Sequence, residues 1–180
     1  EEGDPRVLAY DMLAQAEHDV DAAAILVTTD KRLAAAVAAE VEVQLRDLPT
    51  APTARQSIRR NSAIVVAPSL DAALELSNAF APEHLSIPDT SLLAGVKSAG
   101  SVFVGTYSPE AAGDYASGTN HVLPTSGFAR VRGGLSAADF VKVISVQELG
   151  AAALRRLSGS ITTLARAEGL EAHARSVEVR

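Results

Sequence analysis

Four histidines carry much of the chemistry available to this chain, and each lies in a segment with nearby acidic or amide side chains. Imidazole nitrogens, carboxylate oxygens and amide oxygens can all bind divalent metal ions. The chain has no cysteine, so a zinc ion would be held by nitrogen and oxygen atoms alone, as is common in catalytic zinc sites. The four are His18, His84, His121 and His173. Their surroundings suggest one metal site.

Two of these segments have spacings that suit a shared site. Gln15 and His18 are three residues apart on an expected helix, so both side chains could reach one point. Taken alone, an exposed polar pair at a helix end explains them better, because glutamine is an uncommon zinc ligand. Glu83 and His84 are adjacent and could serve as two separate proton acceptors, or could be a chance pair in a surface turn.

The other two histidines differ in how strongly they indicate function. Asp114 and His121 flank a glycine-rich turn, where turn chemistry is the plain alternative. We favour function there, because Tyr115 and His121 are unusual residues for a merely flexible loop. His173 follows Glu168 by five residues on an expected terminal helix, and a solvent-facing histidine is the simpler interpretation.

Composition excludes several classes of protein. A net charge of −6 argues against nucleic-acid binding, and the short basic stretch at residues 55–60 is typical of a solvated helix face. No apolar run is long enough to cross a bilayer and no signal peptide is present, so we expect a soluble cytoplasmic protein. Phosphate-loop, dinucleotide-binding and serine-nucleophile motifs are missing. The first residue is glutamate rather than methionine, which is compatible with a start part-way through a longer protein.

Hydrophobic periodicity predicts an α/β fold. Asp4 and Pro5 mark a helix start. Apolar runs at 23–28, 62–67 and 101–105 predict buried strands, with helices from about 30 to 45 and from Ser69 onward. Strands that are apolar throughout and alternate with helices indicate a mostly parallel sheet with helices on both faces.

The remainder of the chain shows a different pattern. We expect residues 106–134 to be a functional stretch without regular structure, followed by a short helix, a strand at Val143–Val146 and two helices separated near Gly169. The last part is poor in bulky apolar residues, so we expect it to pack on something else, such as another subunit. We therefore expect an α/β domain at 1–135 that carries the site, and a helical tail at 136–180.

Taken together, these segments resemble the C-terminal portion of the histidinol dehydrogenase family, over nearly the whole chain. The matching runs include Gln-Ala-Glu-His at 15–18, Ala-Pro-Glu-His-Leu at 81–85 and Gly-Ser-Val-Phe-Val-Gly at 100–105. Further matches are Pro-Glu-Ala at 109–111, Gly-Asp-Tyr at 113–115, Asn-His-Val-Leu-Pro-Thr at 120–125, Leu-Ser at 135–136, Asp-Phe at 139–140 and Glu-Gly-Leu at 168–170 with His173. The resemblance implies a Rossmann-like sheet.

The resemblance also implies an activity and a set of site residues. That family oxidises L-histidinol to L-histidine with two NAD molecules, in the last two steps of histidine biosynthesis. It holds one Zn²⁺ per site, and the ligands implied here are Gln15, His18, Asp114 and His173, the last from the partner subunit of an intertwined homodimer. Glu83 and His84 match its two proton acceptors. The substrate contacts implied are Gln15, His18, His84, Asp114, Glu168 and His173, with His121 as a further active-site histidine.

Members of the family are much longer than this chain. The part they have in addition is N-terminal and carries most NAD contacts, so the cofactor-binding residues are unknown here. We expect the 180 residues alone to lack dehydrogenase activity. Two alternatives stay open: a non-catalytic zinc- or imidazole-binding fragment or degenerate homologue, and a structural α/β domain with incidental histidines. The presence of both Glu83 and His84 argues against degeneracy, because simple binding needs neither base.

Overall fold

The structure, a computed structural model, describes residues 3–180 and forms two compact units. Unit 1 ends at Asp139 and mixes helices with strands, whereas unit 2 runs from Phe140 to Arg180 and contains two α-helices. The α/β class and the parallel pairing expected from the sequence are confirmed, as are the C-terminal helices.

The first half of unit 1 follows the helix and strand signals closely. Its elements are α1 (Pro5–Ala16), β1 (Ile25–Thr28), α2 (Lys31–Gln44), α3 (Ala51–Arg60) and β2 (Ala63–Val66). The side chain of Asp4 accepts a hydrogen bond from the first turn of α1, and Asp30 does the same for α2. These N-caps satisfy backbone donors that a helix start leaves free, so both helices begin where the sequence predicts.

The second half of unit 1 holds the elements that carry the candidate site. They are α4 (Leu70–Phe80), β3 (His84–Ile87), the 3₁₀ turn η1 (Thr90–Gly95), β4 (Ser101–Val104), α5 (Glu110–Tyr115) and the 3₁₀ turn η2 (Phe128–Arg130). A further turn, η3 (Ala137–Phe140), spans the boundary between the units. Ser69 caps α4, as its position predicts. The short helix α5 was not expected, since residues 106–134 were predicted to lack regular structure.

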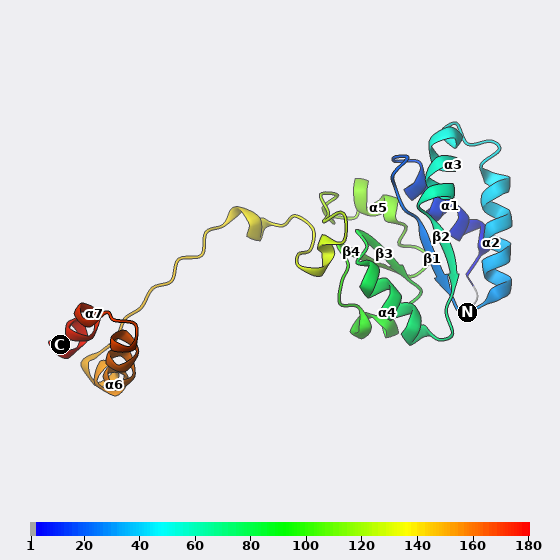
Figure 1. Cartoon of the computed structure of the whole chain (residues 1–180). Helices are drawn as coiled ribbons and strands as arrows, with labels where there is room; N and C mark the ends of the chain where they lie inside the picture. The colour runs from blue at the N-terminus through cyan, green and yellow to red at the C-terminus, as the bar shows by residue number, and fades with distance from the viewer. Residues whose placement is uncertain (1–2) are drawn as a thin grey trace. The chain divides into compact units, whose positions relative to one another are not determined.

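The four strands form two separate parallel pairs rather than one sheet (Figure 1). Ile25 of β1 lies opposite Ala63 of β2, and His84 of β3 lies opposite Ser101 of β4. Helices α2 and α4 both contact β1 and lie on either side of the β1–β2 pair in Figure 1. Two four-residue strands make a marginal sheet on their own, so each pair depends on the helices packed against it.

The core of unit 1 is built from small aliphatic side chains around α1, α2 and α3. Leu13, Val37 and Leu45 are its largest fully buried apolar residues. Ala9, Ala16 and Ala54 have no exposed surface, and their small side chains let the helices approach one another closely. A chain with 4% aromatic residues therefore fills its core by close helix contact rather than with rings.

Unit 2 is a helical hairpin of α6 (Ala151–Ala167) and α7 (Glu171–Glu178), turned at Gly169 with a φ of 77°. Arg166 bridges the two helices by binding Glu171 and Glu178. Residues 141–150 have no regular structure, so the strand predicted at Val143–Val146 is wrong. Val143 is 90% exposed, which gives the physical reason: an apolar run forms a strand only where a neighbouring strand and a core receive it.

Within residues 3–180, every helix falls short of the length or the apolar character that a membrane crossing requires.

The ion pairs of unit 2 predict a measurable pH dependence. Hydrogen bonds from Arg166 and then Arg175 lower the pKa of the Glu171 carboxyl to about 2, against an ordinary value of 4.5. Because the pKa in the folded chain is depressed, the contribution of these pairs to stability is present above pH 4.5 and is lost as the pH falls towards 2. In Arg166→Ala we expect the Glu171 pKa to rise towards its ordinary value, read from the ¹³C shift of its carboxyl. Arg55→Ala in unit 1 should leave that titration unchanged, and an ordinary pKa in the unaltered chain would contradict the expectation.

Candidate active site

Glu83 and His84 are held at the point where β3 begins. The backbone N–H of Ser101 donates to the Glu83 carbonyl at 2.8 Å, which joins the starts of β3 and β4. A Cβ added at Gly100 would lie 2.6 Å from the same carbonyl oxygen, so only glycine permits this approach. The backbone of the predicted acid–imidazole pair is therefore fixed by the neighbouring strand rather than lying in a free surface turn.

The imidazole of His84 is largely buried and faces a carboxylate. Its side chain is 12% exposed, and Nε2 lies 3.6 Å from Oδ1 of Asp114. The imidazole ring lies 5.8 Å from the Phe103 ring, measured between centroids, at an angle of 36°. Nδ1 is buried and has no hydrogen-bond partner in the part of the chain that the structure describes. A buried imidazole with one nitrogen beside a carboxylate and the other uncommitted is a candidate proton acceptor.

Helix α5 brings two carboxylates to this imidazole. Glu110 is its first residue, and Asp114 lies one turn later on the same face. On β3, His84 and Ser86 are two residues apart and project from one face of the strand. Ser86 Oγ donates to Glu110 Oε1 at 3.2 Å, so the strand and the helix meet at two matched positions.

Gly113 lets α5 pack directly on β4. A Cβ there would lie 2.6 Å from two carbons of the Phe103 ring and 2.8 Å from Oγ1 of Thr119. The hydroxyl of Thr119 also donates to the Gly113 carbonyl at 3.1 Å. Because Gly113 has no side chain, α5, which carries Asp114, can lie close to the strand pair that includes His84.

Burial dominates the electrostatics at Glu110. Removal from water raises the pKa of its carboxyl, the charge of His84 and the hydrogen bond from Ser86 act in the opposite direction, and the charges of Asp11 and Asp114 add to the increase. Burial also raises the pKa of Asp11, which lies on α1 one turn before Gln15. Asp11 and Glu110 are therefore close enough for their charges to interact.

The remaining predicted site residues of unit 1 are less enclosed. Gln15 is half-buried in the last turn of α1. His18 is exposed and follows Glu17, the C-cap of α1, so it lies just outside the helix that was expected to carry it. His121 is exposed in the loop beyond α5, next to Asn120, whose side chain accepts from the Val122 N–H at 2.8 Å.

Two predicted site residues belong to unit 2. Glu168 is the C-cap of α6, and His173 lies in α7, and both are exposed. An exposed imidazole on a short helix matches the plain interpretation of His173 as well as a role as a ligand. The structure therefore brings together His84 and Asp114, while Glu168 and His173 lie in the other unit.

The side chains implied as metal ligands suit zinc chemically, and they are distributed over both units. Across residues 3–180, no group of three or more histidine, aspartate or glutamate side chains gathers in a way that could hold a metal ion. The implied ligands are an amide, a carboxylate and two imidazoles, which are nitrogen and oxygen donors that zinc accepts. Asp114, one of the four, is 20% exposed beside His84, so it keeps the access that a ligand needs. The residues fit zinc by chemistry, and three of the four lie in unit 1.

The sequence interpretation assigned no role to three residues near the candidate site: Ser86 and Glu110, which form a hydrogen bond, and Asp11, whose charge acts on Glu110. Glu110 lies in the matching run at 109–111 without an assigned role, Ser86 and Asp11 lie in none of the matching runs, and each of the three follows a structural period from a residue that was identified. Glu110 is four residues before Asp114, Ser86 is two residues after His84, and Asp11 is four residues before Gln15. These spacings could have indicated them once the helix and the strand were assigned correctly.

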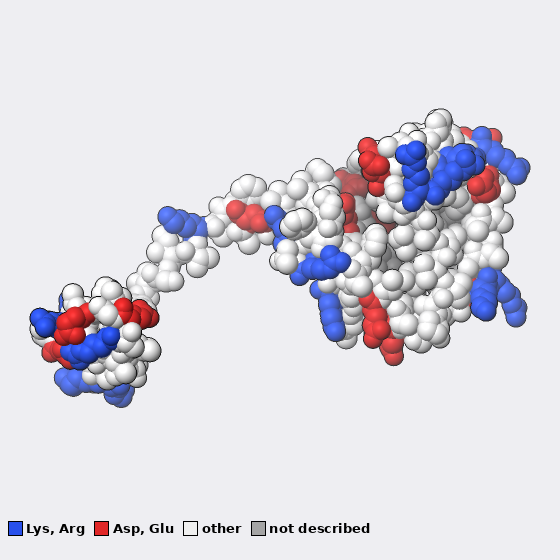
Figure 2. All heavy atoms as spheres, viewed as in Figure 1, with Lys and Arg blue, Asp and Glu red and all other residues white. Residues whose placement is uncertain are grey.

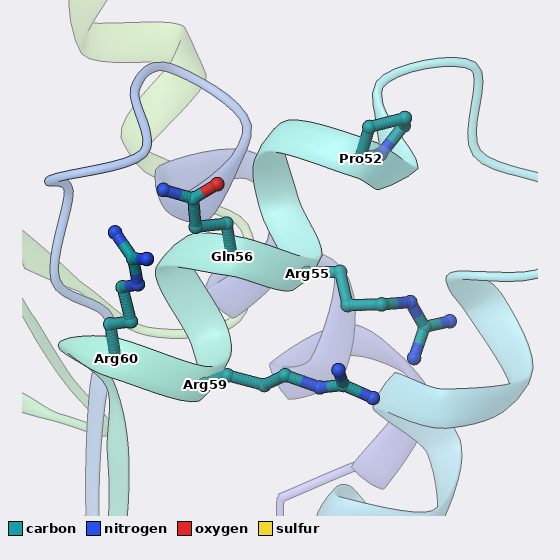
Figure 3. A pocket seen from close by; sticks show the side chains of 5 residues that line it. All are labelled: Pro52, Arg55, Gln56, Arg59 and Arg60. Atoms are coloured by element: carbon teal, nitrogen blue, oxygen red, sulfur yellow. The ribbon is translucent and has the colours of Figure 1, made fainter.

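Two hollows lie on unit 1. One, of about 350 Å³, borders β4 and the start of α5, and its lining includes Phe103, Tyr107 and Ala112. The other, of about 300 Å³, lies on α3, at the end of the unit where Figure 2 shows basic side chains beside acidic ones. Figure 3 shows Arg55 and Arg59 extending to one side of α3 and Arg60 to the other, and Arg55 binds Glu42 at 3.0 Å. Arg60 points away from Arg55 and Arg59, so the three guanidinium groups do not converge on one point. This matches the solvated helix face that the sequence predicts.

Close packing at Gly113 predicts a specific loss of stability. In Gly113→Ala we expect the new Cβ to force α5 away from Phe103 and to lower the free energy of unfolding by about 1–3 kcal/mol, measured by denaturant unfolding. Adding Phe103→Leu should relieve part of this loss, so the double variant should be more stable than the sum of the single effects. Gly159→Ala in α6 is the control, since nothing lies within 4 Å of the added carbon. Strict additivity would show that the two residues do not press on each other.

Comparison with known proteins identifies the family. The chain matches the sequence model of the histidinol dehydrogenase family over residues 1–180. It is 50% identical to the histidinol dehydrogenase of Bacillus anthracis and 49% identical to that of Geobacter metallireducens, covering 100% and 99% of this chain but 43% and 42% of those proteins. A crystal structure of histidinol dehydrogenase from Elizabethkingia anophelis superposes with a TM-score of 0.91 at 40% identity, over 99% of this chain and 42% of that one. The chain thus spans less than half the length of these relatives, and it belongs to the histidinol dehydrogenase family.

Proposed function

We propose that this chain is the zinc- and base-bearing segment of an NAD-linked dehydrogenase that oxidises L-histidinol, through L-histidinal, to L-histidine. The observation that carries the proposal is the pairing of His84 with Asp114 at 3.6 Å, in a largely buried setting. These residues are thirty positions apart in sequence, and they match a proton acceptor and a metal ligand of the family. Their approach supports a shared role in one reaction.

The implied metal ligands are Gln15, His18 and Asp114 of unit 1 together with His173 of unit 2. When bound, Zn²⁺ would supply a fixed positive centre that orients the amino alcohol and its imidazole. Gln15 lies at the end of α1 and His18 just beyond it, and α1 packs into the core of the unit through Leu13 and Ala16. Asp114 is anchored by the packing of α5 on Phe103.

His84 and Glu83 divide the proton transfers between them. His84 takes the hydroxyl proton of histidinol as hydride leaves the carbinol carbon for NAD, and the neighbouring Asp114 carboxylate favours the resulting positive charge. Glu83 then removes a proton from water as it adds to the aldehyde carbon. The second hydride leaves that hydrated carbon for a second NAD, and loss of a further proton gives the carboxylate.

We further propose that the active form is a homodimer in which the partner subunit supplies His173. The apolar side chains that unit 2 leaves exposed support this, since Leu157, Leu164 and Leu170 are 46%, 64% and 41% exposed. Soluble hairpins of this size seldom expose so many leucines without covering them by association. In the same arrangement Glu168 and His173 contact the substrate, together with His121, Gln15 and His18.

A second candidate function is that of a zinc- or imidazole-binding fragment, or a degenerate homologue, without catalysis. The approach of His84 to Asp114 at 3.6 Å is compatible with it, because an imidazole and a carboxylate can bind a ligand without transferring a proton. Such a protein would bind histidinol or zinc but would not reduce NAD.

Enzyme assay and metal analysis together decide between these functions. We expect the 180-residue chain to bind close to one zinc per subunit but to produce no NADH from histidinol. Joined to an N-terminal half of the kind its relatives carry, it should produce two NADH per histidinol. Steady NADH production by the 180 residues alone would overturn the first expectation. Inactivity of the extended protein with zinc bound would favour the non-catalytic function.

The division of labour between the bases has its own test. In the extended protein, Glu83→Gln should slow oxidation of histidinal by about 100-fold and slow oxidation of histidinol by less than about tenfold, because only the second step needs activated water. Single-turnover measurement of each half-reaction gives the two rates. Glu75→Gln, on the exposed side of α4, is the matched control. Equal loss of both half-reactions would reject the assignment.

A further inference from the structure

We propose that Ser86 and Glu110 form a hydrogen-bonded clamp that fixes α5 against β3 and so places Asp114 at His84 for the reaction. Both are positioning residues in this proposal, because neither needs to touch the substrate. The inference rests on the proposed function, since the clamp matters for catalysis only if His84 and Asp114 work together. It goes beyond the site residues that the resemblance implies, which include neither Ser86 nor Glu110.

The geometry of the clamp follows from two structural periods. Residues two apart on β3 and four apart on α5 form a pair of rungs between the strand and the helix. One rung is the hydrogen bond from Ser86 Oγ to Glu110 Oε1 at 3.2 Å, and the other is the 3.6 Å approach of His84 to Asp114. A change in the first rung therefore shifts the second, because strand and helix are each rigid over such a short distance.

Helix α5 depends on such contacts for its position. It has six residues, which is too short to be a stable helix by itself, and its N-cap residue Pro109 makes no side-chain hydrogen bond to it. Gly113 packs on Phe103 without any side chain of its own, so this contact sets distance but leaves sliding along the strand possible. The Ser86–Glu110 hydrogen bond supplies the missing directional restraint at the first turn.

The burial of Glu110 indicates more than a favourable helix start. An acidic residue in the first turn helps a helix through its dipole, but that effect needs only a hydrated carboxylate. Here the Glu110 side chain is half-buried, and its carboxylate accepts a hydrogen bond from Ser86 at 3.2 Å. This hydrogen bond fixes the direction of the carboxylate, which a dipole interaction alone does not require.

In this proposal Glu110 acts through its hydrogen bond to Ser86 and not through its charge. Glu110 accepts through Oε1, and the amide oxygen of glutamine can accept in the same way. Threonine at position 86 would keep the donor hydroxyl and suits a strand. Glu110→Gln and Ser86→Thr should therefore preserve the clamp, whereas Glu110→Ala and Ser86→Ala should remove it.

Kinetics of the extended protein gives the first test. Ser86→Ala and Glu110→Ala should each lower kcat for histidinol oxidation by about tenfold and change KM by less than about twofold, because the substrate still binds but the base and the ligand are misplaced. Ser86→Thr and Glu110→Gln should stay within about twofold of the parent in kcat. The double alanine variant should be no slower than the slower single variant. Glu75→Ala on α4 is the control.

A spectroscopic test on the 180-residue chain does not depend on activity. Long-range ¹H–¹⁵N spectra resolve the imidazoles of its four histidines, and His84→Asn identifies the His84 signals by their loss. The His84 signals should move in both alanine variants and stay in place in Ser86→Thr and Glu110→Gln. Unmoved signals in the alanine variants would overturn the clamp, as would equal shifts in Glu110→Ala and Glu110→Gln. An inactive extended parent with the expected shifts would reject the proposed function and leave the clamp standing.

Discussion

The packing of a six-residue helix on one strand pair is the contact on which the candidate site depends. Gly113 lies so close to Phe103 that this contact sets the distance between α5 and β4. Asp114 is the next residue after Gly113. The carboxylate that faces His84 is therefore placed by a residue without a side chain and by a phenyl ring, neither of which performs chemistry. Dense interiors transmit small displacements, so this contact ties the geometry of the site to the stability of the fold.

The location of the proposed proton acceptors departs from the usual plan of α/β proteins. Ligands of open parallel sheets commonly bind beyond the carboxyl ends of the strands. Here Glu83 and His84 stand at the amino end of β3, where Gly100 lets the neighbouring strand approach the Glu83 carbonyl. The backbone at this end is held by interstrand hydrogen bonds at 2.8 and 2.9 Å, which gives an acid–imidazole pair a rigid support. The carboxyl ends of the strands, where such sheets usually bind ligands, therefore do not mark the position of Glu83 and His84.

The implied metal ligands come from elements with very different surroundings. Gln15 belongs to a helix packed into the main core, Asp114 to a short helix on the second strand pair, and His173 to an exposed helix of unit 2. The proposed metal site would therefore draw its ligands from separately folded parts. The exposed leucines of unit 2 support the proposed homodimer in which the partner subunit supplies one of them.

Sequence alone determined the elements with strong local signals, because caps and apolar periodicity act within a few residues. Asp4, Asp30 and Ser69 start helices where predicted, and the acid–imidazole pair at Glu83 and His84 was found by adjacency. Tertiary structure decided what local signals cannot encode. It divided the strands into two pairs, left the apolar run at 143–146 without a partner strand, and joined the half-buried Glu110 to Ser86 near His84. These outcomes depend on which distant surfaces meet, so a hydrogen bond between residues 24 positions apart follows from packing rather than from any pattern along the chain.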